Sequence, residues 1–537
     1  MAKKTINQWQ FGDFQTPREL AKKIIHVLKQ NHKIFPDVVI EPSCGKGSFI
    51  SASFEAFNDA RILGFDINAE YIAEASASLK CAVSSGRVSL QQADFFVTDW
   101  ATILAAVQGY VLIVGNPPWV TSSELGTLNS TNLPEKSNFQ NRKGIDAITG
   151  AGNFDISEWM LLQHVNWLAQ RDGAIALLCK YAVARKVMRQ VRQTSDHRLF
   201  GHVYPIDARC YFNASVDACL FVLTTDTGNA DCEVYDSLDS TRPSRVIGER
   251  DGFIVSNVEG YEKWKHLRGQ DARYIWRSGV KHDCSKVMEL EPHGPGYKNG
   301  FSEVYTLEDD YLFPLFKSSD IGNGRTASYR KLVIITQKTV GEDTARIKEV
   351  APCTWRYLMD HRVHLNNRKS SIYRNKPEFS VFGIGPYSFK PWKVAISGLY
   401  KKLSFCIVGP LGGKTVAFDD TINFLSFDTE DEASFICGLL TSSPALEFLD
   451  SMIFWDEKRP VTAEILRRLS LREVARQRGS LADYYRWADA QAAPTSGQME
   501  LGIAEKEGAY VTGVPTFNQI NSIAYLPADP ADRSRDQ

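Results

Sequence analysis

The sequence predicts an α/β protein in two parts: a doubly wound sheet of mainly parallel strands, followed by an α+β, strand-rich domain. Three observations support this prediction. The chain has 537 residues, which at roughly 150 residues per domain is enough for two large domains or more. Strand-like and helix-like segments alternate over 1–230, the pattern of a parallel sheet with helices on both faces. After Asp226 the pattern becomes irregular, with short strands, turns and interleaved charged and aromatic residues.

Short apolar runs and their flanking residues indicate the individual elements. Thr16-Pro17-Arg18-Glu19 matches a capping box with proline at the first helical position. Apolar residues at helical spacing from Leu20 to Leu28 then predict the first helix. Buried strands are expected over 38–40, 61–65, 88–91, 110–114, 174–179 and 218–224. Helices are expected between them, notably over 70–79 and 159–169.

The domain boundaries follow from changes in composition. We expect a first domain over 1–230, a linker near 227–250 and a second domain over 250–470. Residues 471–537 are expected to form a C-terminal extension that ends in a disordered tail. Thr121 to Asn153 is rich in Ser, Thr, Asn and Gly, and a loop of this length is expected to be functional or mobile.

The overall composition excludes several classes of protein. Apolar residues make up 43% and charged residues 23%, which is ordinary for a globular protein. The net charge is -1, so a nucleic-acid-binding protein of this composition would need a local basic patch. No apolar run approaches the roughly 20 residues that span a bilayer, and the polar N-terminus does not resemble a signal peptide. A cytoplasmic location, reduced cysteines and no bound metal are therefore expected.

The loop after the first strand is the first candidate ligand site. It reads Glu41-Pro42-Ser43-Cys44-Gly45-Lys46-Gly47, and glycines let the backbone approach a ligand closely. Doubly wound sheets bind ligands at the carboxyl ends of their strands. Glu41 would repel a pyrophosphate, but it can accept a hydrogen bond from an ammonium group or a bridging water. Glycine-rich turns between a strand and a helix are also common where no ligand binds.

Two aspartates end the next two strands. Asp66 lies about 20 residues beyond the glycine loop, where related folds hold ribose hydroxyls. Asp94 is placed to accept a hydrogen bond from the amino group of an adenine ring, with Phe95 or Phe96 as a flat apolar neighbour. Either aspartate could instead act only as a helix cap or a turn residue, and Asn68 could equally cap the helix after Asp66.

The end of the fourth strand carries the most specific chemistry. Asn116-Pro117-Pro118-Trp119 could be simply a rigid turn, because Asn-Pro-Pro breaks secondary structure. Alternatively, the Asn116 amide oxygen and the Pro117 carbonyl could each accept one hydrogen of an exocyclic amine. Two such acceptors favour a tetrahedral nitrogen, whose lone pair then points toward an electrophilic methyl group. The prolines would hold that carbonyl rigidly, and the base could stack on Trp119.

Together these motifs resemble those of S-adenosylmethionine-dependent amino-methyltransferases. Asn116 to Trp119 resembles their catalytic motif, and the Glu41–Gly47 loop resembles their cofactor motif. The segment with Thr16 and Pro17 resembles the motif that contacts the methionine part. The segment from Tyr211 to Leu223 is similar to a later motif whose aromatic residue, best matched by Phe212, stacks on the target base. This order of motifs resembles the gamma class of DNA adenine (N6) methyltransferases with a TaqI-like C-terminal specificity domain.

The resemblance implies a Rossmann-like catalytic domain and a target-recognition domain that act on one flipped adenine in double-stranded DNA. It implies S-adenosylmethionine as cofactor and methylation of the exocyclic N6 amine, with Asn116, Pro117, Pro118 and Trp119 as catalytic residues. The base would stack between Trp119 and Phe212. The implied cofactor-binding residues are Thr16, Pro17, Glu41, Ser43, Gly45, Gly47, Asp66, Asp94 and Phe95. Alternatives are a cytosine-N4 methyltransferase, an RNA or protein-glutamine methyltransferase, and a non-catalytic DNA-binding subunit with the same fold.

A basic segment in the second part is the candidate DNA contact. Between Arg362 and Lys402 there are nine lysines and arginines and a single acid, Glu378. Aromatic residues are interleaved with them, although a solvated face over a strand-rich core would look similar. The predicted DNA-binding residues are Arg368, Lys369, Arg374 and Lys376. We find no nuclease signature in the sequence, so a modification enzyme with a separate restriction endonuclease as partner, or an enzyme of a phage-defence system, is expected.

Overall fold

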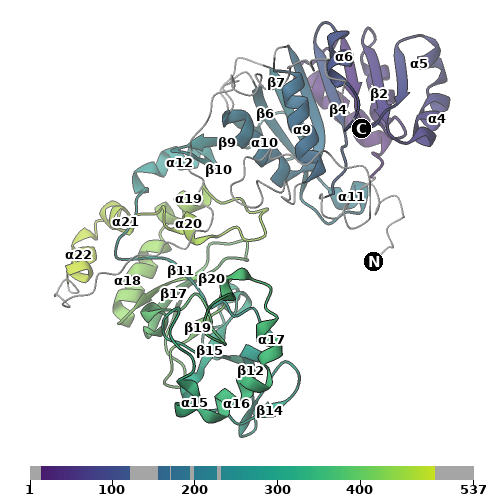
Figure 1. Ribbon diagram of the computed structural model, residues 1–537. Helices are drawn as coiled ribbons and strands as arrows, with labels where there is room; N and C mark the ends of the chain where they lie inside the picture. The colour runs from purple at the N-terminus through teal and green to yellow at the C-terminus, as the bar shows by residue number, and fades with distance from the viewer. Residues whose placement is uncertain (1–13, 121–154, 170, 194–198, 226–230, 490–537) are drawn as a thin grey trace, which may run out of the picture.

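The computed structural model describes residues 14–120, 155–169, 171–193, 199–225 and 231–489 (Figure 1). The first domain lies at one end of the molecule, and a lobe of the second domain lies at the other. The serine- and asparagine-rich stretch 121–153 and the C-terminal tail fall outside the described residues, apart from the helical part of 471–489. Within the described residues, no helix is long and apolar enough to cross a membrane.

The first domain is built on one ten-stranded sheet in the order β10-β9-β8-β6-β7-β5-β4-β1-β2-β3. Its strands are β1 Val38–Glu41, β2 Arg61–Asp66, β3 Val88–Gln92, β4 Val111–Gly115, β5 Gly173–Lys180, β6 Leu199–Ile206, β7 Ala218–Thr225, β8 Cys232–Val234, β9 Arg245–Arg250 and β10 Phe253–Val255. Its helices are α2 Arg18–Gln30, α3 Ser48–Ala56, α4 Ala69–Ser78, α5 Lys80–Ser84, α6 Trp100–Ala105, α9 Ile156–Trp167, α10 Tyr181–Gln193 and α11 Ala208–Phe212. All six predicted strands and both predicted inner helices are confirmed within a few residues.

The order of the strands creates a topological switch point beside β1. This strand pairs in parallel with β2 on one side and with β4 on the other. The chain first adds β2 and β3 on one side of β1 and then returns to add β4 and β5 on the other side. Ligands of doubly wound sheets bind at the carboxyl ends of the strands at such a point. Strand β7 departs from the parallel arrangement, because it lies antiparallel between β5 and β6.

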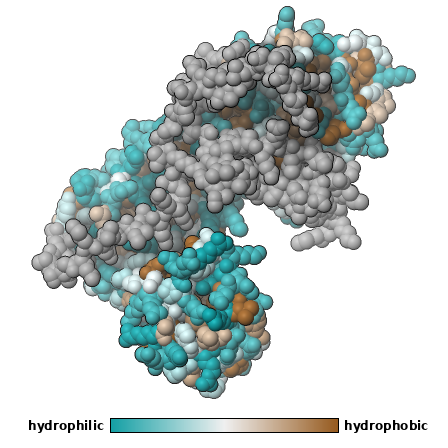
Figure 2. Space-filling view, in the orientation of Figure 1, coloured by the Kyte–Doolittle hydropathy of each residue, from teal (hydrophilic) through white to brown (hydrophobic). Residues whose placement is uncertain are grey.

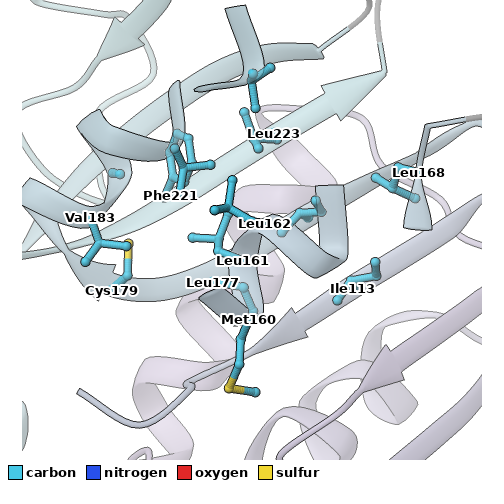
Figure 3. Packing of buried hydrophobic residues seen from close by; sticks show 14 of the residues in the cluster. Ile113, Met160, Leu161, Leu162, Leu168, Leu177, Cys179, Val183, Phe221 and Leu223 are labelled. Carbon is cyan, nitrogen blue, oxygen red and sulfur yellow. The ribbon is translucent and has the colours of Figure 1, made fainter. Parts of the chain in front are cut away.

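Two hydrophobic cores cover the two faces of the sheet. On one face α2 and α3 pack against alternate strand residues such as Val39 and Leu112. On the other face α6, α9 and α10 pack against the intervening residues, and Figure 3 shows Met160, Leu161 and Leu162 of α9 against this side. Because neighbouring strand residues point to opposite faces, the apolar runs of the central strands serve both cores, and each fully buried side chain contributes about 1.5–3 kcal/mol.

The first helix begins one residue later than the capping-box pattern predicts. Helix α2 starts at Arg18, and the residue before it, Pro17, makes no side-chain hydrogen bond to the helix. The capping-box prediction is therefore wrong. Instead, the Thr16 carbonyl accepts a hydrogen bond of 2.7 Å from the Ser48 hydroxyl. This contact ties the segment before α2 to the start of α3.

The first domain extends beyond the predicted boundary at residue 230. Strands β8, β9 and β10 continue the sheet from β6 as far as Val255, so the described part of the predicted linker is structured. These strands are only three to six residues long, and such short runs leave little periodicity in the sequence.

The second domain contains two smaller sheets with the strand orders β11-β20-β17-β18 and β14-β13-β12-β16-β15-β19. Its strands are β11 Arg277–Ser278, β12 Glu289–His293, β13 Gly296–Lys298, β14 Val304–Tyr305, β15 Leu312–Phe316, β16 Lys331–Ile334, β17 Trp392–Ser397, β18 Phe405–Val408, β19 Ala417–Phe418 and β20 Ile422–Phe427. Its helices are α12 Val258–Trp264, α13 Ser285–Met288, α14 Ser318–Gly322, α15 Ile347–Val350, α16 Pro352–Asp360, α17 Arg362–Asn366, α18 Glu430–Leu440, α19 Ser443–Asp450, α20 Ala463–Leu466, α21 Leu471–Gln477 and α22 Leu481–Asp489. This mixture of short strands and helices matches the predicted α+β class. Residues 280–389, called the distal lobe below, lie farthest from the first domain in Figure 1.

The predicted start of a C-terminal extension at residue 471 is also wrong. Leu471, Val474 and Tyr484, from α21 and α22, are buried in the same core as Phe427 of β20 and Phe448 of α19. The second domain therefore continues to the end of α22 at Asp489.

The two domains are joined by a buried ion pair and an aromatic contact. Arg185 of α10 pairs with Asp456 and, at 3.1 Å, with Glu457. Its guanidinium lies 4.6 Å from the centre of the Phe454 ring. Only 10% of the Arg185 side chain is exposed, so the second domain is docked on α10, the helix that follows β5.

One lysine of the second domain is buried in its core and gives a stability prediction. Lys393 of β17 is 1% exposed, and burial lowers its pKa to about 7, whereas an unfolded chain keeps the usual pKa near 10.4. Between these values the unfolded chain holds the proton and the folded chain does not, so this residue makes stability rise with pH. We expect Lys393→Met to stabilise the domain, and the gain should be smaller at pH 9 than at pH 7 by up to about 1.4 kcal/mol per pH unit.

Urea unfolding of the full chain at the two pH values measures this difference. Lys390→Met is the matched control, because Lys390 is only three residues away but is partly exposed and paired with Asp428 at 2.9 Å. A gain for Lys393→Met that is equal at pH 7 and pH 9 would contradict the prediction.

Candidate active site

The glycine loop lies at the carboxyl end of β1, at the switch point. Gly45 and Gly47 both have positive φ angles, +50° and +80°, which glycine adopts at little cost. A Cβ atom at Gly45 would lie 2.6 Å from Gln15 Oε1, so no larger residue fits there without moving that side chain. Gly47 immediately precedes α3, and Ser43 is half-buried in the same loop.

Glu41 lies beneath this loop with its carboxyl group buried. The residue is 2% exposed, and its Oε2 atom has no hydrogen-bond partner. Burial and the nearby Asp66 carboxylate raise the pKa of Glu41 well above its usual value. A buried acceptor without a donor is costly, and a cationic ligand above the loop would favour its ionised form.

Asp66, at the end of β2, faces the glycine loop. Its Oδ2 atom accepts a hydrogen bond of 2.7 Å from the Gly45 N–H, and its Oδ1 atom accepts one of 2.9 Å from the Asn68 N–H. The cap of α4 is Asn68, whose side chain accepts from the N–H groups of Glu70 and Tyr71. Asp66 is therefore not the helix cap. It lies next to the glycine loop, as expected for two parts of one ligand site.

The carboxylate of Asp94, at the end of β3, accepts a hydrogen bond of 2.9 Å from the Phe96 N–H. The prediction of Phe95 as a cofactor contact is not supported, because its ring is 8% exposed and packs in the core against Trp100 and Trp167. Phe96 and Trp159 are half-buried instead, with ring centres 5.3 Å apart.

Ile67 and Trp159 are two further apolar candidates for contact with the cofactor, which the sequence alone does not indicate. Ile67 follows Asp66 directly and is 40% exposed, which is unusual for a large apolar residue at the end of a buried strand. Trp159 contacts the rings of both Phe95 and Phe96, which links it to the end of β3.

The side chain of Asn116 has one end bound and one end free. Its Nδ2 atom donates a hydrogen bond of 2.8 Å to the Phe14 carbonyl. Its Oδ1 atom is buried and has no hydrogen-bond partner among the residues that the structure describes. Since a carbonyl can only accept, the amide group of Asn116 must face Phe14 with its nitrogen. The oxygen is therefore left free to accept a hydrogen bond from a ligand.

Three aromatic rings pack together, and one of them belongs to Phe14, whose carbonyl binds the Asn116 amide. The rings of Trp119 and Phe212 meet edge to face with their centres 5.1 Å apart, and the ring of Phe14 lies 5.7 Å from Trp119 and 6.1 Å from Phe212. The indole N–H of Trp119 donates to the Leu178 carbonyl at 3.2 Å. The structure brings the two predicted stacking residues together, but their rings are in direct contact and leave no space for a base between them.

The predicted basic segment of the distal lobe is only partly available to a ligand. Arg368 donates to the Leu365 and Ser380 carbonyls at 2.7 Å and stacks on the Tyr373 ring at 3.7 Å. Its assignment as a DNA contact is therefore corrected: it fastens the loop that follows α17. Lys369, Arg374 and Lys376 are exposed on that loop, on a lobe whose visible surface is mostly hydrophilic in Figure 2.

Other charges of the segment are also engaged within the protein. Arg362 pairs with Glu378, Lys390 pairs with Asp428, and Lys393 is buried. The net charge of +8 counted along the sequence therefore overstates the charge that a partner would meet.

Comparison with known proteins identifies the family. The family described as N-6 DNA Methylase matches residues 3–259, which cover the whole described first domain. The Type II methyltransferase M.NspV from Nostoc sp. is 42% identical over 470 residues, which are 87% of this chain and 97% of that protein. The chain belongs to the N-6 DNA methylase family. It is an S-adenosylmethionine-dependent DNA methyltransferase that acts on the N6 amine of adenine.

Solved structures of methyltransferases are also similar to part of this chain, at low identity. An rRNA methylase from Streptococcus thermophilus is 10% identical, covers 39% of this chain and 95% of its own, and gives a TM-score of 0.24. A methyltransferase from Geobacter sulfurreducens is 14% identical, covers 40% of this chain and 80% of its own, and gives a TM-score of 0.22.

The residues at the switch point of this methylase fit S-adenosylmethionine. The buried Glu41 carboxyl, whose Oε2 atom has no partner among the described residues, suits a cationic ligand, and the positive φ angles of Gly45 and Gly47 let the backbone approach it. Asp66 and Asp94 end neighbouring strands on the same side. Within the described residues, no three His, Cys, Asp or Glu side chains converge as a metal site would require.

Replacing Asp66 should weaken cofactor binding more than replacing any surface carboxylate. Asp66→Ala removes the hydrogen bond to Gly45 together with the carboxylate that we expect to accept from the ribose. At roughly 0.5–1.5 kcal/mol per hydrogen bond, the dissociation constant of S-adenosylmethionine should rise about 10- to 100-fold. Calorimetry with the wild type and the exposed-site control Asp59→Ala measures this. An unchanged affinity in both Asp66→Ala and Asp94→Ala would show that the cofactor site is assigned incorrectly.

Proposed function

We propose that Asn116 and Pro117 activate the adenine amine of a flipped base. The Asn116 Oδ1 atom and the Pro117 carbonyl would each accept one hydrogen of the amine, while the two prolines keep the loop rigid. S-adenosylmethionine, when bound, supplies the electrophilic methyl group. The residues stabilise the positive charge that develops on the nitrogen, so catalysis rests on positioning and electrostatics.

The observation that carries this proposal is the free amide oxygen of Asn116. It is buried, it has no hydrogen-bond partner, and the bond from Nδ2 to Phe14 keeps the side chain from rotating. A residue that only shaped a turn would satisfy its own oxygen or expose it to water. Asn116 directly follows β4, the strand next to β1, and the loop after β1 is the proposed cofactor site.

Trp119 and Phe212 remain the proposed contacts of the target base. Their edge-to-face contact at 5.1 Å means that a base can enter only if one ring moves. Phe212 is the better candidate for movement, because it ends the short helix α11 and is followed by Asn213 in the left-handed conformation. The indole of Trp119 is fixed through its bond to Leu178.

The second domain is the proposed reader of the DNA sequence. A site that takes a single flipped base cannot read the neighbouring base pairs, so these must be read by side chains on another surface. The exposed residues Lys369, Arg374 and Lys376 are the proposed phosphate contacts. M.NspV is a Type II methyltransferase of similar length, which supports a role in modification beside a separate restriction endonuclease.

Expression in a bacterial host without adenine methylation tests this function. Single-molecule sequencing of the host DNA should show N6-methyladenine at one defined sequence motif, and none when Asn116→Ala is expressed. N4-methylcytosine in place of methyladenine, or no methylation by a folded protein that binds S-adenosylmethionine, would contradict the proposal.

A further inference from the structure

The segment Phe14–Thr16 touches both halves of the active site. The Phe14 carbonyl accepts the hydrogen bond from Asn116 at 2.8 Å. The next residue, Gln15, accepts a hydrogen bond from the Lys46 N–H in the glycine loop at 3.1 Å. The Thr16 carbonyl accepts from Ser48, just after that loop, at 2.7 Å. Three consecutive residues therefore connect the catalytic amide with the loop beneath the cofactor.

The contact with Phe14 decides which way the Asn116 amide points. A carboxamide carries a donor on one side and an acceptor on the other, and a backbone carbonyl can pair only with the donor. Turning the amide over would place two acceptors against each other and would aim N–H groups at the target amine. The Phe14 carbonyl thus selects the one orientation in which the amide keeps Oδ1 available as an acceptor for the target amine.

We propose that the Phe14 carbonyl is a positioning group for methyl transfer, and that Gln15 fixes its position relative to the glycine loop through the hydrogen bond from Lys46. The proposal rests on the catalytic role of Asn116 given above. It adds that the orientation of this amide depends on the segment before α2, so the cofactor loop and the catalytic amide are linked. A side-chain amide without this partner would rotate and spend much of its time in an unproductive orientation.

Asn116→Asp tests the carbonyl directly, because it keeps an oxygen acceptor and removes the donor. When ionised, the new carboxylate would face the Phe14 carbonyl with two acceptors opposed. When protonated, it can donate its O–H to Phe14 and present its other oxygen to the amine. The single-turnover rate of Asn116→Asp relative to wild type should therefore rise as the pH falls from 8.5 to 5.5, by up to about tenfold per unit.

Three outcomes of this experiment separate the two proposals. A relative rate that increases toward low pH supports positioning by Phe14. A relative rate that stays constant over the whole pH range, whether high or low, overturns it. If Asn116→Ala methylates DNA as fast as the wild type, the catalytic role of Asn116 itself is wrong, and the failure lies in the proposed function.

A second variant tests the link through Gln15. Gln15→Met has a side chain of similar length but cannot accept the hydrogen bond from Lys46. At saturating cofactor and DNA we expect it to lower the single-turnover rate about tenfold in the wild type, and less than about twofold in the Asn116→Ala background. Saturation removes any effect on cofactor affinity, and circular dichroism confirms the fold. An equal loss in both backgrounds would mean that Gln15 does not act through Asn116, and would overturn the link.

Discussion

Asn116→Ala is expected to lower the rate of methyl transfer by on the order of 10²–10³, as the loss of a preorganised hydrogen-bonding group does in other enzymes. The variant loses the buried Oδ1 acceptor, and the Phe14 carbonyl loses its donor. The glycine loop keeps its own hydrogen bonds to Gln15 and Asp66, so the affinity for S-adenosylmethionine should stay within a few-fold of wild type. Single-turnover incorporation of labelled methyl groups into DNA measures the rate, and calorimetry measures the cofactor affinity.

The exposed residue Asn58 offers a matched control, since Asn58→Ala makes the same chemical change away from the site. It should methylate DNA at the wild-type rate. If Asn116→Ala keeps activity within about tenfold of wild type, the amide is not the activating group, because an acceptor worth only that much contributes less than such groups usually do.

The chemistry at the ends of the strands could be predicted from the sequence. Glu41, Asp66, Asp94 and Asn116 each follow a short apolar run, and a parallel sheet brings the carboxyl ends of its strands to one edge. The position of each residue at the end of a strand is therefore enough to predict that these side chains share one edge of the sheet. The structure confirms these strands and places Asp66 2.7 Å from the Gly45 N–H.

Side-chain direction could not be predicted, because contacts between residues distant in the sequence decide it. Phe95 and Phe96 are adjacent aromatics, and only the packing of Trp100 and Trp167 shows which one enters the core. Likewise, a count of charges treats Arg368 like Lys369, whereas the Ser380 carbonyl and the Tyr373 ring hold only the arginine.

Strand β6 could not be predicted either, for a different physical reason. Strand β6 reads Leu-Phe-Gly-His-Val-Tyr-Pro-Ile, and its glycine and proline are unfavourable in strands. It forms because β7 and β8 lie on either side of it. The loss of one backbone donor at Pro205, near its end, costs little there.

The hydrogen bond between Asn116 and Phe14 spans 102 positions, and no local pattern in the sequence predicts it.

Replacing the three exposed cations of the distal lobe should change how DNA binding depends on salt. Each phosphate contact that is lost should reduce the slope of log affinity against log salt by about 0.9. Lys369→Gln, Arg374→Gln and Lys376→Gln together should thus flatten the slope by about 2.7 if all three touch phosphates. The advantage of the wild type over the triple variant should be roughly forty times larger at 50 mM salt than at 200 mM. Fluorescence anisotropy with a labelled duplex measures both slopes.

The same segment supplies the control, because Arg362 and Lys390 are already paired with Glu378 and Asp428. The double variant Arg362→Gln/Lys390→Gln removes two positive charges and leaves Glu378 and Asp428 unpaired. It should flatten the slope by less than the triple variant does. The methylated sequence motif should be the same in the triple variant, since phosphate contacts position the duplex without reading it. A relaxed motif would instead assign base contact to Arg374, the arginine of the three. A slope equal to wild type would show that these cations form only a solvated face, and the phosphate contacts would then have to lie on another surface.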